Sequence, residues 1–312
     1  MIDTILNHPL IDDVKAIDVE TYMAQKPRLA SAERDALVSY RTMLVLSISY
    51  PHEAVAWNGK GYGLVSRYAY GLDYHRVFDS AFEDIEKTLK TKGIKAKGYA
   101  DISPFDERFV AALANMGYIG KNQFLIHPRF GTYHYLGILL VDAALSTEGY
   151  LSDDCGDCTR CIEACPTGAL DAGFDERLCS SYVTQMKAPL TDADITPLKT
   201  MVYGCDICQR VCPKNADRTF VPRPHFMADE HAQLNLENLL ALSNKAIEKT
   251  FRTYAFVWRG GLVLKRNAMA LLLNQGMRES LPLMRDVASR YAHVPWFHAD
   301  ATRIISKLEE LP

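Results

Sequence analysis

The chain has 312 residues, of which 48% are hydrophobic and 23% are charged, a composition typical of a folded globular protein with two or three packed units. No apolar stretch approaches the roughly 18 residues of a membrane-spanning helix, and the acidic, interrupted N-terminus is unlike a signal peptide. The net charge of −3 and a pI near 6.3 argue against a protein that coats nucleic acid. We therefore expect a cytoplasmic protein.

The first half of the chain alternates between strand and helix patterns. Residues 42–50 form a mostly apolar run rich in β-branched residues, which predicts a buried strand, and residues 135–142 predict another. Between them, residues 75–92 carry apolar side chains at helical spacing. This alternation predicts an α/β domain over residues 1–147.

The segment DISPFDER (101–108) is expected to open a further helix. Ser103 is the predicted N-cap, and Pro104 takes the first helical position, where proline is favoured. Because Ser103 would already cap this helix, Asp101 is available for another role. The alternative is that Asp101 is an ordinary turn residue.

All eight cysteines lie between residues 155 and 212. They follow the order Cys155-x2-Cys158-x2-Cys161-x3-Cys165-Pro166, then Cys179, then Cys205-x2-Cys208-x3-Cys212-Pro213. The first run has the spacing of bacterial ferredoxins, in which the fourth cysteine ligates the other of two clusters. Zinc ribbons are the alternative, but they usually have two C-x2-C knuckles for each metal ion.

We therefore predict a ferredoxin-like domain with two 4Fe–4S clusters over residues 148–232. One cluster is assigned to Cys155, Cys158, Cys161 and Cys212, and the other to Cys165, Cys179, Cys205 and Cys208. Such a pair of clusters transfers single electrons. A ferredoxin alone needs only about a quarter of this chain, so the other residues must have another function.

From residue 233 to 312 the pattern is entirely helical. Four segments each carry apolar residues on one face, with short breaks between them: LENLLALSNKAIEKTF, LVLKRNAMALLLNQG, ESLPLMRDVASR and HADATRIISKLEEL. Paired short helices of this kind resemble one or two HEAT-like units. The alternative is a helical cap that covers one side of the core.

Several blocks along the chain together resemble the epoxyqueuosine reductase family. They are YGLDYHRV (70–77), DISPFDER (101–108), GYIGKNQFLIHPRFGTYHYLG (117–137), CGDCTRCIEACPTGAL (155–170), LCSSYVTQMK (178–187), YGCDICQRVCPKN (203–215) and LLALSNKAIEKTF…WRG…KRNA (239–268). They cover most of the chain in the order of the family. The cysteine run alone would be less specific.

The resemblance implies a fold and an activity. The family has an α/β domain that binds cobalamin, a two-cluster ferredoxin domain and a helical C-terminal region. It reduces the epoxide of epoxyqueuosine, at the wobble position of certain tRNAs, to an alkene. Electrons pass through the clusters to the cobalt of a base-off cobalamin, by a cobalt–carbon or a cobalt–oxygen route. We expect a monomer that receives its electrons from a flavodoxin or ferredoxin.

The resemblance also implies site residues. Asp101 matches the catalytic aspartate that donates a proton, and its pKa would have to be raised by desolvation against the corrin. Asp73 matches an aspartate that holds the cyclopentane diol, although it could also cap the following helix. The expected cofactor contacts are Arg28, Ser66, Asp101, Leu125, Leu136 and Ser181.

Some of these positions differ from the residues found in the family or in known cofactor-binding motifs. Ser66 stands where some relatives have cysteine near the cobalt, so a role that requires sulfur is lost. Asp73-Tyr74-His75 begins like the D-x-H-x-x-G motif of corrinoid ligation, but Phe78 replaces the glycine, so His75 is not expected to bind cobalt. Leu125 and Leu136 could equally be ordinary core residues. Residues 117–122 lack the full phosphate-loop pattern, which argues against ATP binding.

Contact with tRNA requires basic residues in a chain that is acidic overall. Lys187, which follows the YVTQ run, is the predicted substrate contact. Arg259, Lys265 and Arg266 lie near Trp258 in the sequence and could neutralise phosphates while the indole stacks on a base. The C-terminal region is shorter than in many relatives, which limits the contacts that it can supply.

Two other functions are compatible with parts of this pattern. A corrinoid enzyme similar to reductive dehalogenases shares the pairing of domains, but such enzymes usually carry a twin-arginine signal, and none is seen here. An electron-transfer protein would bind no corrinoid and would not need Asp101.

Overall fold

The computed structural model describes residues 2–150 and 153–311, and the chain divides into two compact units. The first unit consists of Met1–Pro51, Tyr74–Cys161 and Gln209–Arg223, and the second of His52–Asp73, Ile162–Cys208 and Pro224–Pro312. The cysteine-bearing segment is thus shared between both units, whereas the sequence predicted three consecutive domains. The difference arises because the chain passes from one unit to the other within this segment, between Cys161 and Ile162 and between Cys208 and Gln209.

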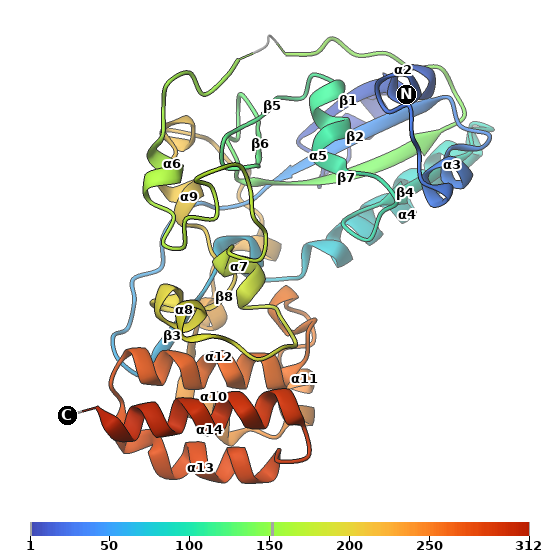
Figure 1. Ribbon diagram of the computed structural model, residues 1–312. Coiled ribbons are helices and arrows are strands. Elements are labelled where there is room, and N and C mark those ends of the chain that lie inside the picture. The colour runs from blue at the N-terminus through green and yellow to red at the C-terminus, as the bar shows by residue number, and fades with distance from the viewer. Residues whose placement is uncertain (1, 151–152, 312) are drawn as a thin grey trace. The chain divides into compact units, whose positions relative to one another are not determined.

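The first unit is built on a four-stranded antiparallel sheet with the order β1-β2-β7-β4 (Figure 1). Its strands are β1 (Asp13–Asp18), β2 (Thr42–Ser49), β4 (Ala96–Tyr99) and β7 (His134–Val141). β2 and β7 confirm the two strands that the sequence predicted. Every residue of β2 is buried, because this central strand is covered on both faces.

Helices pack on both faces of this sheet. They include α1 (Ile2–Leu6), α2 (Val19–Gln25), α3 (Ser31–Leu37), α4 (Tyr74–Thr91) and α5 (Glu107–Leu113). On one face α4, which was predicted, buries Phe78 and Phe82. Gly137 permits this contact, since a Cβ atom there would lie 2.6 Å from the Phe78 ring. The opposite face joins Val45 and Ile138 in one core with Val110 of α5.

The predicted start of α5 is wrong. Asp106, not Ser103, is the N-cap, and its carboxylate accepts a hydrogen bond from the Phe109 amide at 3.2 Å. Ser103 Oγ instead accepts from the Phe105 amide at 3.1 Å, within the turn that precedes the helix. The cap lies later because Phe105 is buried in the core, which directs the chain inward before the helix can begin.

The second unit combines a small sheet with a group of helices. The sheet has the order β8-β3-β9, in which β3 (Tyr62–Val65) is parallel to β8 (Met201–Tyr203) and antiparallel to β9 (Gln233–Asn235). The helices are α7 (Ser180–Val183), α8 (Asp192–Ile195), α10 (Leu236–Ala241), α11 (Asn244–Thr250), α12 (Gly261–Asn274), α13 (Leu281–Arg290) and α14 (Pro295–Glu310). Two short helices cross the unit boundary, α6 (Arg160–Glu163) and α9 (Ile207–Arg210).

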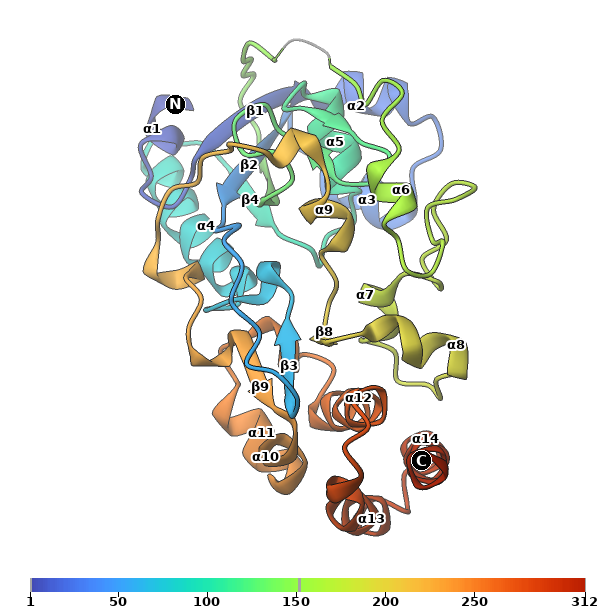
Figure 2. The ribbon, with the colours of Figure 1, turned by 90° about the vertical axis from the view of Figure 1, so that its left-hand side faces the viewer.

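The region after residue 233 is mainly helical, as expected, but two details of the prediction differ from the structure. β9 occupies the first three residues of the segment that was expected to be entirely helical. In addition, α12 is buried on all sides, including Lys265 and Arg266, rather than on one face. The reason is its central position, since α10, α11, α14 and β8 all pack against it (Figure 2). α13 and α14 do have the expected two faces.

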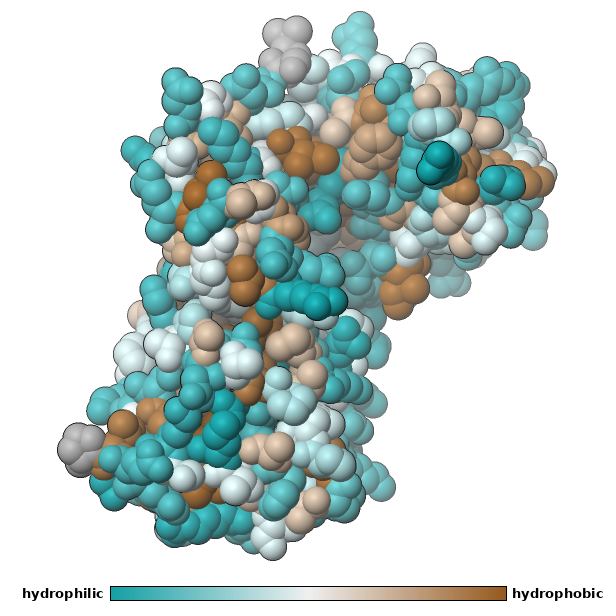
Figure 3. All heavy atoms as spheres, viewed as in Figure 1, coloured by the Kyte–Doolittle hydropathy of each residue, from teal (hydrophilic) through white to brown (hydrophobic). Residues whose placement is uncertain are grey.

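The surface of the helical segment is mainly polar on the side seen in Figure 3, where polar side chains cover α13 and α14 and apolar ones are scattered. None of the helices in the described residues is long and apolar enough to span a membrane.

Candidate functional site

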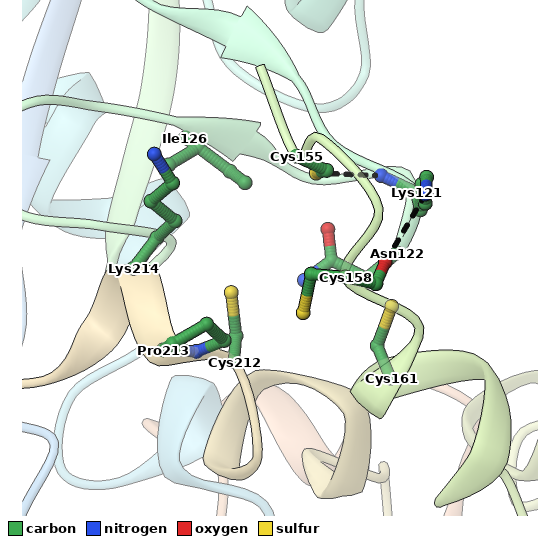
Figure 4. Close-up of a pocket in the computed structure, with 9 residues that line it drawn as sticks. All are labelled: Lys121, Asn122, Ile126, Cys155, Cys158, Cys161, Cys212, Pro213 and Lys214. Atoms are coloured by element: carbon green, nitrogen blue, oxygen red, sulfur yellow. Dashed lines mark hydrogen bonds between the residues drawn. The ribbon is translucent and has the colours of Figure 1, made fainter. Parts of the chain in front are cut away.

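Four of the eight cysteines line one pocket of the first unit. Cys155, Cys158, Cys161 and Cys212 share it with Lys121, Asn122, Ile126, Pro213 and Lys214 (Figure 4). The sulfur atoms of Cys158, Cys161 and Cys212 are directed into the common space in Figure 4. The structure thus brings together the four residues that the sequence assigned to one cluster, including the distant Cys212. Four converging thiols are the donor set of a 4Fe–4S cluster.

The other four cysteines, Cys165, Cys179, Cys205 and Cys208, all belong to the second unit. Cys205 follows β8, and Cys179 directly precedes α7. Next to Cys205, the carboxylate of Asp206 accepts a hydrogen bond from the Arg67 guanidinium at 2.9 Å. Both side chains of this ion pair are less than one-tenth exposed. The pair was not predicted, because nothing in the sequence connects residues so far apart.

Among the described residues, no group of three or more His, Cys, Asp or Glu side chains is arranged to hold a single metal ion. The pocket of Figure 4 is instead lined by sulfur atoms around a shared space.

Asp101 lies in an exposed turn of the first unit. Its backbone has the left-handed φ of 57°, and its side chain is 62% exposed. The neighbouring Ile102 is 88% exposed, which is unusual for an isoleucine. The Asp101 carboxylate pairs with Nε2 of His75 at 3.1 Å. This hydrogen bond lowers the pKa of Asp101, so the expected rise of its pKa is not found in this conformation.

Glu107 orients this turn from the first residue of α5. Its carboxyl oxygen accepts a hydrogen bond from the Asp101 amide at 2.7 Å. Burial raises the pKa of Glu107 to about 8, so that this carboxyl group is mainly protonated at neutral pH. This contact could not be predicted from the sequence, where Glu107 is only one residue of the DISPFDER segment.

The other predicted site residues are divided between the two units. Arg28 is exposed on the loop between α2 and α3, and Leu125 is only 2% exposed within the core of the first unit. Leu136 is partly buried against the same core. Their expected contacts with a corrin therefore stay predictions. In this structure Leu125 packs as a core residue.

In the second unit, Ser66 is fully buried, and its hydroxyl oxygen has no hydrogen-bond partner among the described residues. Ser181 is partly buried on α7, where its carbonyl oxygen accepts from the Gln185 side chain at 2.9 Å. Asp73 precedes α4, and its amide donates to the carbonyl oxygen of Thr253 at 2.7 Å. A buried hydroxyl that lacks a partner, such as that of Ser66, suits a site that binds a polar group.

Two of the basic residues expected to contact tRNA are structural. Lys265 is fully buried, and its ammonium donates to the carbonyl oxygens of Leu239, Leu240 and Leu242 at 2.6 to 2.9 Å, at the C-terminal end of α10. Arg266 is also buried, and it donates to the carbonyl oxygens of Val183 and Ala188. The prediction that both contact phosphates is wrong, because neither side chain can reach solvent.

Lys187 and Arg259 remain available for an external partner. Lys187 is exposed, two residues after Gln185. The Arg259 guanidinium lies 3.9 Å from the centre of the Trp258 ring. Trp258 is 58% exposed and donates through its indole nitrogen to Gln185 Oε1 at 2.8 Å. This arrangement holds an aromatic ring and a cation together at the surface.

Residues 117–126 form a β-hairpin and not a phosphate loop. β5 (Tyr118–Ile119) pairs with β6 (Leu125–Ile126), and the tip between them faces the first group of cysteines. The Lys121 amide lies 3.5 Å from Cys155 Sγ, and its ammonium donates to the carbonyl oxygens of Gly156 and Cys158.

Comparison with known families identifies two regions. Residues 33–102 match the family described as "Epoxyqueuosine reductase QueG, DUF1730". Residues 154–215 match the family described as "4Fe-4S double cluster binding domain". The second match supports the predicted domain for two 4Fe–4S clusters rather than the zinc alternative.

Similar proteins extend the match over most of the chain. The epoxyqueuosine reductase of Staphylococcus aureus is 31% identical over 262 residues, which are 81% of this chain and 69% of that protein. The epoxyqueuosine reductase of Bacillus subtilis is 34% identical over 72% of this chain and 60% of its own length. The chain therefore spans about two thirds of the length of these relatives.

Solved structures agree in fold. A selenomethionine-labelled epoxyqueuosine reductase matches 98% of this chain with a TM-score of 0.90 and 27% identity, and the match covers 89% of that protein. An epoxyqueuosine reductase with an epoxyqueuosine-modified tRNA stem loop matches 98% of this chain and 88% of its own, with a TM-score of 0.86 and 27% identity. A Bacillus subtilis structure with its catalytic loop swung out of the active site has a TM-score of 0.87 and 26% identity over 98% of this chain and 89% of that one.

Proposed function

This chain belongs to the epoxyqueuosine reductase family of oxidoreductases, and we propose from this premise that it reduces epoxyqueuosine to queuosine in tRNA. The observation that carries the proposal is the match along 98% of the chain to a structure that holds an epoxyqueuosine-modified tRNA stem loop. In the reaction both carbon–oxygen bonds of the epoxide break, and a carbon–carbon double bond forms. Two electrons and two protons are consumed, and the oxygen leaves as water.

Electron transfer is assigned to the two cysteine sets. Cys155, Cys158, Cys161 and Cys212 ligate one 4Fe–4S cluster in the pocket of Figure 4, and Cys165, Cys179, Cys205 and Cys208 ligate the other. Each cluster carries one electron at a time, so two transfers complete a turnover. An external carrier of the flavodoxin or ferredoxin type supplies the electrons, and the protein acts as a monomer in the cytoplasm.

The reduction also requires a group that reacts with the epoxide, and we assign this role to a base-off cobalamin. When bound, its cobalt supplies electrons at low potential to the substrate. The buried hydroxyl of Ser66, which lacks a partner among the described residues, fits the many amide groups of a corrin. The other proposed cofactor contacts are Arg28, Leu125, Leu136 and Ser181.

Asp101 is the proposed proton donor. In the conformation described here, solvent exposure and the contact with His75 keep its carboxylate charged. To donate a proton it must leave His75 and enter a less solvated environment, which raises its pKa. The exposed Ile102 and the left-handed backbone of Asp101 support an outward position of this turn. A relative described with its catalytic loop swung out of the active site offers a parallel.

Substrate binding is assigned to the second unit. Lys187 and Arg259 would neutralise phosphates of the anticodon region, and the exposed ring of Trp258 would stack on an unpaired base. Asp73 would accept hydrogen bonds from the two hydroxyl groups of the cyclopentane ring. The modified base must leave its stack to reach a buried reaction centre.

The proton donor can be tested with two isosteric substitutions in the same segment. Anaerobically reconstituted protein with cobalamin would be given epoxyqueuosine-containing tRNA, and queuosine would be measured by mass spectrometry of the digested nucleosides. Asp101→Asn is expected to slow conversion by roughly 100-fold or more, with iron content and tRNA affinity unchanged. Asp106→Asn is the control, since asparagine caps a helix as well as aspartate does. Full activity of Asp101→Asn would contradict the assignment.

A further inference from the structure

The tip of the β5–β6 hairpin presents Asn122 to the first cysteine pocket. The turn is fixed by hydrogen bonds from the Gly120 amide to the Phe124 carbonyl and from the Gln123 amide to the Gly120 carbonyl, both at 2.9 Å. Gly120 leaves room for neighbouring side chains, since a Cβ atom there would lie 2.5 Å from Ile126 Cδ1 and 2.9 Å from Asn122 Oδ1. The backbone of residue 122 is therefore held firmly beside the cysteines.

The side chain of Asn122 has one half of its amide satisfied. Its Oδ1 accepts a hydrogen bond from the Phe124 amide at 3.3 Å, which determines which end of the amide points to the turn. Its Nδ2 is buried and has no hydrogen-bond partner among the described residues. The whole residue is only 4% exposed. A buried amide nitrogen without a partner has lost its hydrogen bonds to water without compensation, so such groups are rare in the absence of a ligand.

The position of this spare donor indicates its acceptor. Asn122 lines the same pocket as Cys155, Cys158, Cys161 and Cys212 (Figure 4). Cluster sulfur atoms and cysteine thiolates are negatively charged acceptors, and hydrogen bonds to them are known to set cluster potentials. The backbone amide of the adjacent Lys121 already lies 3.5 Å from Cys155 Sγ. The hairpin tip therefore supplies two neighbouring donors on the same side of the pocket.

We infer that Asn122 Nδ2 donates a hydrogen bond to a sulfur atom of the 4Fe–4S cluster in this pocket and thereby raises the reduction potential of that cluster. This inference rests on the proposed ligand set of the cluster. One-electron reduction adds a negative charge to the cluster, so a hydrogen-bond donor stabilises the reduced form more than the oxidised form. Asn122 thus favours acceptance of an electron by this cluster.

Two substitutions separate this role from the support that Asn122 gives to the hairpin. Asn122→Asp keeps an oxygen that can accept from the Phe124 amide, but it removes the donor and adds a negative charge. Asn122→Leu removes both the donor and the acceptor at similar volume without adding charge. Asn7→Asp is the matched control, since Asn7 is an exposed residue of the same unit and the chemical change is the same.

The measurement is a redox titration of the reconstituted holoprotein with dithionite, followed by electron paramagnetic resonance of the reduced clusters. Cys212→Ser identifies the signal of this cluster. Asn122→Leu and Asn122→Asp are expected to lower the equilibrium constant for its reduction by about tenfold, which is about 59 mV for one electron, and Asn122→Asp the more strongly. Iron content and the potential of the other cluster should not change.

Two failures can be distinguished. If Cys212→Ser leaves both cluster signals intact, the ligand set is wrong, and the inference about Asn122 falls with it. If Cys212→Ser removes or alters one signal but both Asn122 variants keep the potential of that cluster, the ligand set stands and the role of Asn122 is overturned. Should Asn122→Leu fail to incorporate iron, Asn122→Asp, which preserves the turn, decides the question.

Discussion

The two cysteine sets differ in the kind of polar side chain that is buried next to one of their cysteines. Beside Cys205 in the second unit, Arg67 and Asp206 form a buried ion pair in which each charge balances the other. Beside Cys155 in the first unit, the hairpin tip leaves the Asn122 amide nitrogen without a partner among the described residues. A balanced pair mainly contributes to stability, whereas a spare donor has hydrogen-bonding capacity left for a ligand. Substitutions in the two regions should therefore have different consequences.

The largest effect is expected from the cysteines themselves. Cys212→Ser and Cys208→Ser should each reduce iron from about eight to about four atoms per chain, because each removes a ligand of a different cluster. Both variants should lose epoxyqueuosine reduction, since either gap interrupts electron transfer. Iron analysis and the nucleoside assay check this result. If one of these single variants lost both clusters, the assignment of the cysteines to two separate ligand sets would be contradicted.

The balanced pair can be broken at one end. Asp206→Asn leaves the buried Arg67 charge uncompensated and should lower the free energy of unfolding by about 3 to 5 kcal/mol. The control is Glu309→Gln, which breaks the exposed pair with Arg285 and should cost at most about 1 kcal/mol. Anaerobic urea denaturation measures both. Equal urea midpoints of unfolding for the two variants would show that breaking the buried pair of Arg67 and Asp206 costs no more stability than breaking an exposed pair.

Two lysines of the second unit likewise differ, since one stabilises the fold and the other is exposed for a partner. Lys265→Met removes three hydrogen bonds at the end of α10 and should lower stability by about 2 to 4 kcal/mol, while tRNA affinity is retained by the folded protein. Lys187→Met should leave stability unchanged but weaken tRNA binding. It should also reduce the slope of log binding constant against log salt concentration by about one. Filter binding over a range of salt concentrations, with thermal denaturation, separates the two. A salt dependence unchanged in Lys187→Met would remove it from the tRNA interface.

The smallest effect concerns the pH dependence of stability through Glu107. Its pKa is raised from 4.5 to about 8 by burial, so the unfolded chain loses this proton at lower pH than the folded protein. Stability should therefore fall as the pH rises from about 4.5 to 8. Glu107→Gln keeps an acceptor for the Asp101 amide and should be more stable than the wild type by about 1 to 3 kcal/mol at pH 8.

At pH 4.5 the two proteins should differ little, because the carboxyl group of Glu107 is then protonated in the folded protein and still about half protonated in the unfolded chain. Denaturation curves at several pH values provide the comparison. A difference that is the same at pH 4.5 and pH 8 would contradict the raised pKa of Glu107.

The sequence predicted the elements with strong periodicity and the identity of the clusters. β2, β7 and α4 were found where their apolar patterns placed them, and the spacing of the cysteines brought Cys212 together with the first run. The two strands and the helix depend on local spacing, which a sequence displays directly, whereas the place of Cys212 was inferred from the ligand pattern of two-cluster ferredoxins. The helix cap at Asp106 was missed because the burial of Phe105, a tertiary effect, determines where α5 begins.

Features that depend on contacts between distant segments could not be predicted. Lys265 and Arg266 look like surface residues in a helical pattern, and only the packing of four elements around α12 shows that they are buried. The partner of Asp206 is 139 residues away along the chain. The Asn122 donor was detectable only in part, since the sequence places it beside Lys121 but does not show which of its atoms lacks a partner.

The central claim is that this chain reduces epoxyqueuosine with electrons from two clusters and with cobalamin. The most direct test is conversion of epoxyqueuosine-containing tRNA by the anaerobically reconstituted protein, with and without added cobalamin, measured by mass spectrometry of the nucleosides. We predict that queuosine accumulates only when iron, cobalamin and a reductant are all present. A protein that holds both clusters and cobalamin but forms no queuosine, or one that forms it equally well without cobalamin, would contradict this account.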